Sequence, residues 1–374
     1  MNPETLFCLN LDCPSRGQIG QGNIVIHSQT ENRCKCTVCG DTFAATKGTI
    51  FYRLRTQAET VILVLTLLAN GCPTQAVVKA FGFDERTIKR WWMRAGEHCE
   101  SFHKTMLSQE ALDLEQVQAD EIKAKTQGGS YWMAMAMLVR TRLWLGGVIS
   151  AKRDKRLIQA LANQIQALAL CRPLLLAVDG LPSYVTAFRN AFRSKLPRLG
   201  LKGRPKLVAW PNIAIVQVVK QRVGSDLRVD RRIVQGSAGL VESLITRTQA
   251  GSGTINTAFI ERLNATFRQR LHWLTRRSRS LAHQADTLSA GMFIVGALYN
   301  FSDTHHSLRL KLWLSDSTYR WVHRTPAIAA GLTDHVWSVS EVFNFRLPPP
   351  RWSPPKRRGR PSKETLRLVE RWCS

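Results

Sequence analysis

Three carboxylates stand out: one in an acidic pair among strand-like residues, one at the end of an apolar run, and one in a segment rich in arginine, asparagine and apolar residues. Asp120 lies in "LEQVQADEIKAK", Asp179 ends the run "PLLLAVD", and Glu261 lies in "NTAFIERLNATFRQR". Three converging carboxylates would repel one another unless a cation shared them. Ligation by oxygen alone favours Mg²⁺ or Mn²⁺, and two such ions can clamp the attacking and leaving oxygens of a phosphoryl displacement. These acids therefore predict a two-ion site.

The cysteines indicate a second kind of metal site. Five of the nine cysteines fall within the first 39 residues, in "FCLNLDCPSRG" and "RCKCTVCGDTF". Two cysteine pairs of this kind typically hold one tetrahedral Zn²⁺, which stabilises a segment too small to fold on a core of its own. We predict a zinc ribbon with a structural Zn²⁺ bound by Cys8, Cys13, Cys36 and Cys39. Cys34 is interpreted as a spare or competing ligand.

The charge of the chain favours a polyanionic partner. The 374 residues include 53 Lys and Arg against 27 Asp and Glu, a formal net charge of +26. Nucleic acid and an anionic membrane surface are the two partners that such a surplus suits. The longest apolar run, Val61–Ala69, has half the length that a bilayer span needs, and the first ten residues lack the pattern of a secretory signal. We expect DNA rather than a membrane as partner, and a reducing cytosol as location.

Two short helices joined by a glycine are predicted after the cysteine segment. Thr74 caps the first helix, Gly82 ends it, and Asp84 caps the second. A basic second helix after such a turn indicates a helix-turn-helix with its recognition helix around residues 85–95. An ordinary helical hairpin is the alternative. The predicted DNA contacts in the second helix are Arg86, Lys89, Arg90 and Arg94.

The pattern changes from helical to alternating at about residue 114. Three sequential strands are predicted, followed by a helix, a buried strand that ends at Asp179, and another helix. This order is typical of a ribonuclease-H-like α/β fold, in which the first and fourth strands are neighbours. Asp120 and Asp179 would then lie close together, and Glu261 could reach them from a later helix. Glu121 is interpreted as a bystander on the opposite face of its strand.

The order of these segments resembles a DDE transposase of a prokaryotic insertion sequence. The resemblance is carried by the zinc ribbon, the helix-turn-helix, "QADE", "AVDG" and "NTAFIERLNATFRQR", and covers about residue 5 to about residue 340. It implies that Asp120, Asp179 and Glu261 bind two Mg²⁺ or Mn²⁺ ions, and that the enzyme cleaves and joins strands of double-stranded DNA. Arg268, seven residues after Glu261, would contact the DNA end. The resemblance also implies a homo-oligomer.

The long interval between Asp179 and Glu261 departs from many such enzymes. It contains strand-like runs at Lys206–Trp210 and Ile213–Lys220, interpreted as a fifth strand and a basic hairpin insertion at about 197–250. For Glu261 itself, a surface ion pair with an arginine is the alternative interpretation. The interval also supplies three rival third acids, namely Asp226, Asp230 and Glu242.

The C-terminal segment "LPPPRWSPPKRRGRPSKETLRLVERW" is proline-rich and basic, which predicts a disordered tail. Arg358 and Arg360 lie in an AT-hook-like motif, which would place the arginines in a narrow minor groove. A nonspecific phosphate-binding arm is an equal alternative. His305 and His306 are interpreted as exposed polar histidines after a helix rather than metal ligands.

Five parts are expected along the chain. They are a zinc ribbon at 1–50, a helix-turn-helix domain at 51–104, a catalytic domain at 105–310, an extension at 311–345, and the basic tail at 346–374. A transposase is the leading hypothesis for function. A catalytically inactive or domesticated DNA-binding regulator of the same fold is the alternative, and a nuclease that hydrolyses DNA without joining it is a third.

Overall fold

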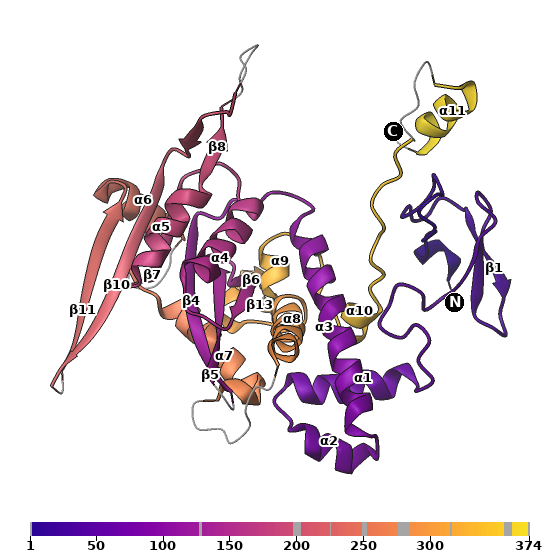
Figure 1. Ribbon diagram of the computed structural model, residues 1–374, viewed down its shortest axis with the longest axis horizontal. Helices are drawn as coiled ribbons and strands as arrows, with labels where there is room; N and C mark the ends of the chain where they lie inside the picture. Colours follow the sequence, from indigo (N-terminus) through magenta and orange to yellow (C-terminus); the bar gives the residue numbers. More distant parts are fainter. Residues whose placement is uncertain are drawn as a thin grey trace. The chain divides into compact units, whose positions relative to one another are not determined.

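The computed structural model describes residues 2–126, 129–196, 203–224, 226–248, 253–275, 284–314, 316–354 and 361–372. The chain divides into two compact units. One unit joins Met1–Ala58 to Phe343–Ser374 and holds the N-terminal cysteines, and the other spans Glu59–Val342 and holds the three carboxylates (Figure 1). The helical segment predicted as a separate DNA-binding domain lies mostly within the second unit.

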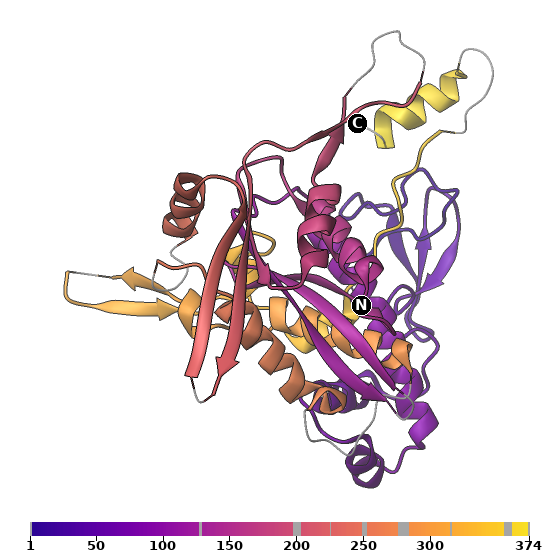
Figure 2. The same cartoon turned by 60° about the vertical axis from the view of Figure 1, so that its left-hand side comes forward.

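A six-stranded mixed sheet forms the centre of the larger unit (Figure 2). Its strand order is β11-β10-β7-β4-β5-β6, with the bounds Asp226–Gln235, Ile213–Val223, Leu174–Asp179, Gln116–Thr126, Gly129–Leu138 and Leu143–Ser150. β4, β5 and β6 pair antiparallel in sequence order, whereas β7 pairs parallel with both β4 and β10. The predicted mixed α/β class is confirmed.

The strands of the interval before Glu261 differ in part from the prediction. The run predicted at Lys206–Trp210 forms only β9, Leu207–Ala209, which pairs with β8, Arg193–Lys195, outside the main sheet. The second run extends further than predicted as β10, and β11 returns antiparallel beside it at the edge of the main sheet. The interval therefore adds one antiparallel edge strand, β11, beside the parallel strands β10, β7 and β4.

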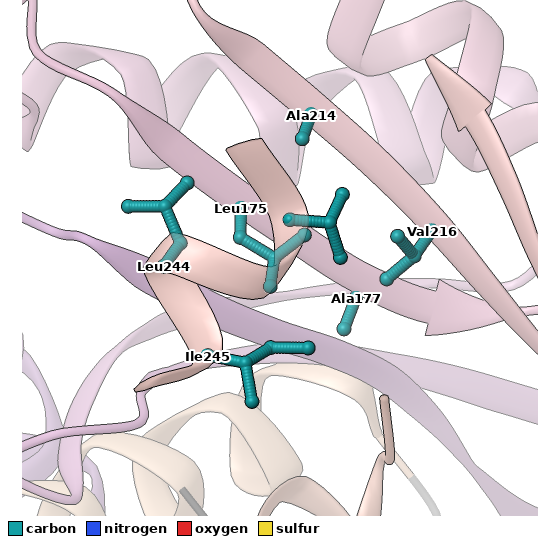
Figure 3. Packing of buried hydrophobic residues seen from close by; sticks show 7 residues of the cluster. Leu175, Ala177, Ala214, Val216, Leu244 and Ile245 are labelled. Carbon is teal, nitrogen blue, oxygen red and sulfur yellow. The ribbon is translucent and has the colours of Figure 1, made fainter. Parts of the chain in front are cut away.

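Helices cover both faces of the sheet. The bounds of these helices are Lys155–Leu168 for α4, Pro182–Ala191 for α5, Ala238–Thr248 for α6 and Ala258–Arg270 for α7. α6 packs leucine, isoleucine and valine side chains onto β7 and β10 (Figure 3); the buried cluster is Leu175, Ala177, Ala214, Val216, Val241, Leu244 and Ile245. Gln118 pairs with Ala177 in the sheet and contacts α7, so α6 and α7 cover the same face.

Two long helices pack together beside this sheet. Their bounds are Glu85–Leu107 for α3 and Ala285–Phe301 for α8. A Cβ added to Gly96 of α3 would lie 2.3 Å from the Cβ of Ala290 in α8, so the helices cross where only glycine fits. Asn300 of α8 exchanges two hydrogen bonds, each of 2.9 Å, with the backbone of Trp144 in β6. The second half of α3 is thus tied through α8 to the central sheet.

The smaller unit contains a three-stranded antiparallel sheet, β1 (Ile24–Ser28), β2 (Arg33–Cys36) and β3 (Thr42–Ala44). Phe43 and the buried cysteines form its core. Segments from the C-terminal end of the chain contact it: Arg346 donates to the carbonyl of Ala45, and Gln18 donates to the carbonyl of Trp372 at 2.7 Å.

The C-terminal segment is not wholly the extended tail that its composition predicts. Residues Lys363–Trp372 form helix α11, whose first turn is capped by a hydrogen bond of 3.1 Å from the Thr365 N–H to the Ser362 hydroxyl. The proline-rich composition ends before this point, so the helix is compatible with the local sequence. Arg358 and Arg360 of the AT-hook-like motif lie outside the described residues.

The remaining elements are short or peripheral. They are η1 (Pro3–Thr5), α1 (Ala58–Ala69), α2 (Thr74–Phe81), η2 (His272–Leu274), η3 (His306–Leu308), β12 (Leu310–Trp313), β13 (Tyr319–Val322), α9 (Pro326–Ala329) and α10 (Val339–Asn344). Across the described ranges, no helix combines the length and the apolar character that crossing a membrane requires.

Candidate functional site

Four cysteines of the smaller unit converge on one point. Cys8, Cys13, Cys36 and Cys39 each place a sulfur within 4.8 Å of the others, with 3.7 Å between the sulfurs of Cys8 and Cys39. Cys34 lies on β2 with Cys36 and is also buried, but it does not belong to this group. Four thiolates at this spacing could hold one tetrahedral metal ion and leave no coordination position open.

Polar groups around these sulfurs tune their charge. Burial acts to raise the pKa of Cys36, but hydrogen bonds from the backbone of Cys39 and Val38, together with side-chain hydrogen bonds from Ser15 and Cys39, lower it to about 7. The buried hydroxyl of Ser15 lies 3.1 Å from the sulfur of Cys13 and accepts a hydrogen bond of 2.9 Å from Asn23. A thiolate, which is the form that binds metals, is therefore accessible near neutral pH at Cys36.

A second potential metal site lies where β4 leaves β7. The last residue pair between these parallel strands is Gln118 with Ala177, so Asp120 and Asp179 come just beyond the paired region. Oxygen atoms of Asp120, Glu121 and Asp179 lie within 4.8 Å of one another. The two predicted aspartates are therefore neighbours, and a third acid joins them.

Glu121 is not a bystander. The Glu121 side chain extends towards α5, where it accepts a hydrogen bond of 2.7 Å from Tyr184. This is the direction, away from Asp120, that strand alternation predicts. However, Asp179 is the last residue of β7, and the Arg153 guanidinium pairs with both Glu121 and Asp179. The side chain of Glu121 is only 1% exposed. Alternation along β4 could not reveal that Glu121 and Asp179 share Arg153, since this sharing depends on where β7 ends.

The electrostatics at Asp120 indicate a shortage of positive charge. Burial is the main cause that raises its pKa, to about 7, and the neighbouring charges of Glu121, Asp179 and Glu261 add to the effect. The hydrogen bond from the Glu121 N–H opposes the shift. Asn264 of α7 donates to the other Asp120 oxygen at 2.7 Å, which fixes the orientation of the carboxylate. A divalent cation is the ligand that such a group favours.

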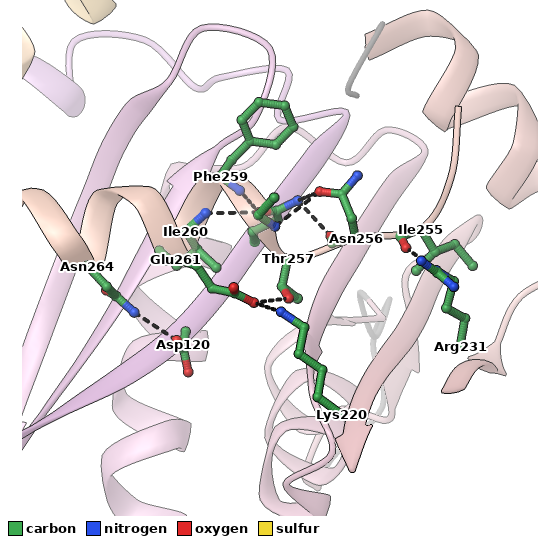
Figure 4. Close-up of polar contacts among 12 residues, drawn as sticks. Asp120, Lys220, Arg231, Ile255, Asn256, Thr257, Phe259, Ile260, Glu261 and Asn264 are labelled. Carbon is green, nitrogen blue, oxygen red and sulfur yellow. Dashed lines mark hydrogen bonds and ion pairs between the residues drawn. The ribbon is translucent and has the colours of Figure 1, made fainter. Parts of the chain in front are cut away.

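Helix α7 is fastened to β4 at its first turn (Figure 4). The side-chain oxygen of Gln118 accepts hydrogen bonds of 3.0 Å from the N–H groups of both Phe259 and Ile260, and its amide donates to the carbonyl of Asn256 at 2.7 Å. Thr257, the residue before the helix, makes no side-chain cap. Gln118 therefore replaces the missing cap from a distant strand.

This attachment places Glu261 beside the aspartates. Its carboxylate accepts a hydrogen bond of 2.7 Å from the Thr257 hydroxyl and forms an ion pair with Lys220 of β10 (Figure 4). At 45% exposure it is far more open to solvent than Glu121. Glu261 does form an ion pair, and its partner among the described ion pairs is a lysine of the sheet.

All three predicted acids line one cleft of about 840 Å³. The cleft also exposes Arg153, Lys220 and Arg268, and the last of these lies two turns along α7 from Glu261. Among the described residues, the rival acids Asp226, Asp230 and Glu242 do not line it. The cleft thus combines carboxylates, which can bind cations, with basic groups, which can bind an anionic substrate.

The predicted DNA-contacting helix has a basic first half. Arg86, Lys89 and Arg90 of α3 are exposed, whereas Arg94 is half-buried. Lys89 donates to the side chain of Gln284 at 3.0 Å. Gly82 ends α2 in the left-handed conformation, and Asp84 caps α3 through the Arg86 N–H, as the sequence predicts.

Sequence reasoning missed the residues that orient the acids. Gln118 is two residues before Asp120 and so lies on the same strand face, and Asn264 lies one turn after Glu261. That spacing is the one local signal that could have identified them. Arg153 and Tyr184 come from other elements, and no local pattern links them to the acids.

A scan against protein-family models finds no match, and a search of curated proteins finds no relative. The geometry and chemistry of these sites therefore carry the functional assignment.

Replacing Gln118 by alanine is expected to lower the free energy of unfolding by about 1–3 kcal/mol, because two helix N–H groups lose their partner. Chemical denaturation of the full chain measures this loss. A matched control is Gln75→Ala, which removes an exposed amide that donates to Glu85. A loss for Gln118→Ala no larger than that of the control would show that the contact does not fasten α7.

Replacing Cys13 by alanine is expected to abolish metal binding in the smaller unit, since three thiolates leave a tetrahedral ion incompletely bound. The number of metal ions bound per chain, measured by inductively coupled plasma mass spectrometry after dialysis, reports this loss. Cys34→Ala is the control because Cys34 is equally buried but lies outside the group. Equal metal loss in both variants would contradict the assignment of ligands.

Proposed function

We propose that the protein is a DDE transposase, which binds double-stranded DNA at the ends of a mobile element and catalyses metal-dependent strand cleavage and strand transfer. The observation that carries this proposal is the convergence of Asp120, Asp179 and Glu261 in one cleft with Lys220 and Arg268. These acids come from β4, β7 and α7, three elements far apart in the sequence. A chain with a net charge of +26 is suited to a polyanionic substrate.

The arrangement of the sheet supports this proposal. In the sheet, β6, β5 and β4 are antiparallel and are followed by the parallel strands β7 and β10. This is the order expected of a ribonuclease-H-like fold, in which an acid on the first strand faces an acid at the end of the fourth. β11 is an addition to that pattern.

The proposed ions are Mg²⁺ or Mn²⁺, held by Asp120, Asp179 and Glu261. Carboxylate ligands suit these hard cations, and the raised pKa of Asp120 reflects a site that needs positive charge. When bound, two such ions supply charge stabilisation for the attacking and leaving oxygens of an in-line phosphoryl transfer. Asn264 orients Asp120, and Thr257 orients Glu261.

The basic residues of the cleft are assigned to the DNA. Lys220 and Arg268 flank Glu261 from β10 and α7, and both can hold phosphate groups of the strand against the acids. Hydrolysis breaks a phosphodiester bond at an element end and frees a 3′-hydroxyl group. Attack of that hydroxyl on a phosphodiester of a second strand forms the joining bond and displaces the 3′-hydroxyl of the strand that is broken. The exposed Arg86, Lys89 and Arg90 of α3 are assigned to recognition of the ends.

The four-cysteine group is assigned to a structural Zn²⁺ ion. Sulfur-only ligation at this spacing is typical of zinc, and a fully occupied coordination sphere has no catalytic position. By its resemblance to DDE transposases, the protein is also proposed to act on paired ends as a homo-oligomer.

One observation favours a second candidate, a catalytically inactive DNA-binding regulator. Arg153 pairs with Glu121 and Asp179, and Lys220 pairs with Glu261, so side chains of the protein already balance much of the acidic charge. Asp120 has no such partner among the described ion pairs and retains a raised pKa. Because the charge of Asp120 is left unbalanced in this way, the enzyme remains the favoured candidate.

Replacing Glu261 by glutamine is expected to reduce cleavage and joining by about 100-fold or more, since loss of residues that merely support a metal ligand already costs up to that factor. The assay uses Mg²⁺ and DNA that carries the sequences flanking the gene. Binding to the same DNA is expected to remain.

Glu242→Gln is the matched control, because Glu242 is a rival acid on α6 that does not line the cleft. If Glu242→Gln loses cleavage and joining while Glu261→Gln retains them, the third metal-binding acid lies in the interval before α7. DNA binding by the unmodified protein without cleavage in either Mg²⁺ or Mn²⁺ would favour the regulator.

A further inference from the structure

Helix α7 lines a second cavity on the side away from the acids. This cavity has a volume of about 350 Å³, at the small end of the range for ligand pockets. In Figure 4 the ring of Phe259 points away from Glu261 and Asp120. Residues from β5, the turn after β5, α7, α8 and the loop after α8 line the cavity. Those that matter here are Arg142, Phe259, Arg262, Tyr299, His305 and His306.

The cavity gathers cations that lack counter-ions. Among the described residues, neither Arg142 nor Arg262 forms an ion pair, and both line the cavity. The Arg142 guanidinium lies 3.8 Å from the centre of the Phe259 ring and donates to the carbonyl of Val139. Burial lowers the pKa of Arg142, and the charge of Arg262 adds to the effect. Arg142 is partly buried and Arg262 is exposed, so it is mainly the charge of Arg142 that is costly without an anion nearby.

A histidine in the same cavity has an unused ring nitrogen. Nε2 of His305 is buried and has no hydrogen-bond partner among the described residues. Its ring packs edge-on against Tyr299, with 4.6 Å between ring centres. The sequence-based interpretation of an exposed polar histidine is therefore wrong for His305, which is half-buried, and fits His306, which is exposed. Buried polar atoms without partners are rare, so this nitrogen also points to a ligand.

The acid whose charge acts on Tyr299 and His305 does not neutralise the cavity. Asp303 contributes to the electrostatics at Tyr299 and His305, but it forms an ion pair of 2.6 Å with Arg270. The charge that remains is positive, beside the apolar walls of Phe259 and Tyr299. A ligand with a phosphate group and a flat apolar part matches both features.

We propose that this cavity binds one nucleotide of a DNA strand, with its phosphate held by Arg142 and Arg262 and its base or sugar against Phe259 and Tyr299. The proposal rests on DNA being the substrate. A guanidinium group can bind two phosphate oxygens at once, and stacking of a base on an aromatic side chain tolerates any base. Helix α7 then contacts DNA on both sides, through Arg268 in the acidic cleft and through Arg262 in this cavity.

The test measures the thermal stability of the full chain with inorganic phosphate as probe, at constant ionic strength and without divalent metal. Phosphate is expected to raise the melting temperature because it binds the folded state. Arg262→Gln is expected to weaken the apparent phosphate affinity by about tenfold or more, since it removes a charge-assisted contact. Because this change also relieves repulsion between cations, the variant is expected to melt no lower than the unmodified protein in chloride alone.

Arg320→Gln on β13 is the matched control, an exposed arginine away from both cavities. Its phosphate response is expected to equal that of the unmodified protein. Equal responses in Arg262→Gln and Arg320→Gln would overturn the proposal.

Two further probes separate DNA from a free nucleotide. The proposal expects a short single-stranded oligodeoxynucleotide to compete with phosphate, and expects this competition to weaken in Arg262→Gln. Binding of deoxyadenosine monophosphate without competition by the oligonucleotide would make the cavity a free-nucleotide site and would overturn the proposal. Because the readout needs neither metal nor catalysis, an inactive acidic site leaves it intact, and loss of cleavage in Glu261→Gln is a separate result.

Discussion

The arrangement of both cavities depends on one contact, the attachment of helix α7 to strand β4 through Gln118. A helix begins with N–H groups that have no partner inside the helix. Gln118 accepts from two of them and donates to the preceding segment, so the first turn of α7 is fixed to the centre of the sheet. Asp120 lies two residues further along β4, and Glu261 lies one turn into α7, so the same contact sets the distance between these acids.

Charge balance is the second constraint on the site. Asp120, Glu121 and Asp179 lie too close together to be stable as three isolated anions. Arg153 and Tyr184 stabilise Glu121, and Lys220 stabilises Glu261, while burial leaves Asp120 with a raised pKa. The outer acids therefore have internal partners, whereas Asp120 has none among the described ion pairs, and this difference underlies the proposed cation site. A strongly basic surrounding then makes the same cleft attractive to a phosphate backbone.

Features with a local signature could be predicted from the sequence, and those built by distant contacts could not. The apolar run before Asp179 predicts a buried strand, and the paired cysteines predict a four-sulfur group; both are present. The α/β class follows from the change in periodicity near residue 114. The link from Arg153 to Asp179 joins separate elements with no shared pattern. The capped first turn of α11 does have a local signal in Ser362, but the proline-rich composition before it obscures that signal.

Anomalous diffraction from crystals of the full chain grown with Mn²⁺ would test the central claim most directly. Oxygen-rich sites that bind Mg²⁺ also accept Mn²⁺, whose anomalous signal locates the ion. The account predicts an Mn²⁺ peak in contact with carboxylate oxygens of both Asp120 and Asp179, in the cleft that Glu261 lines. Saturating Mn²⁺ with no peak at these aspartates, and with the Arg153 and Lys220 ion pairs unchanged, would contradict it.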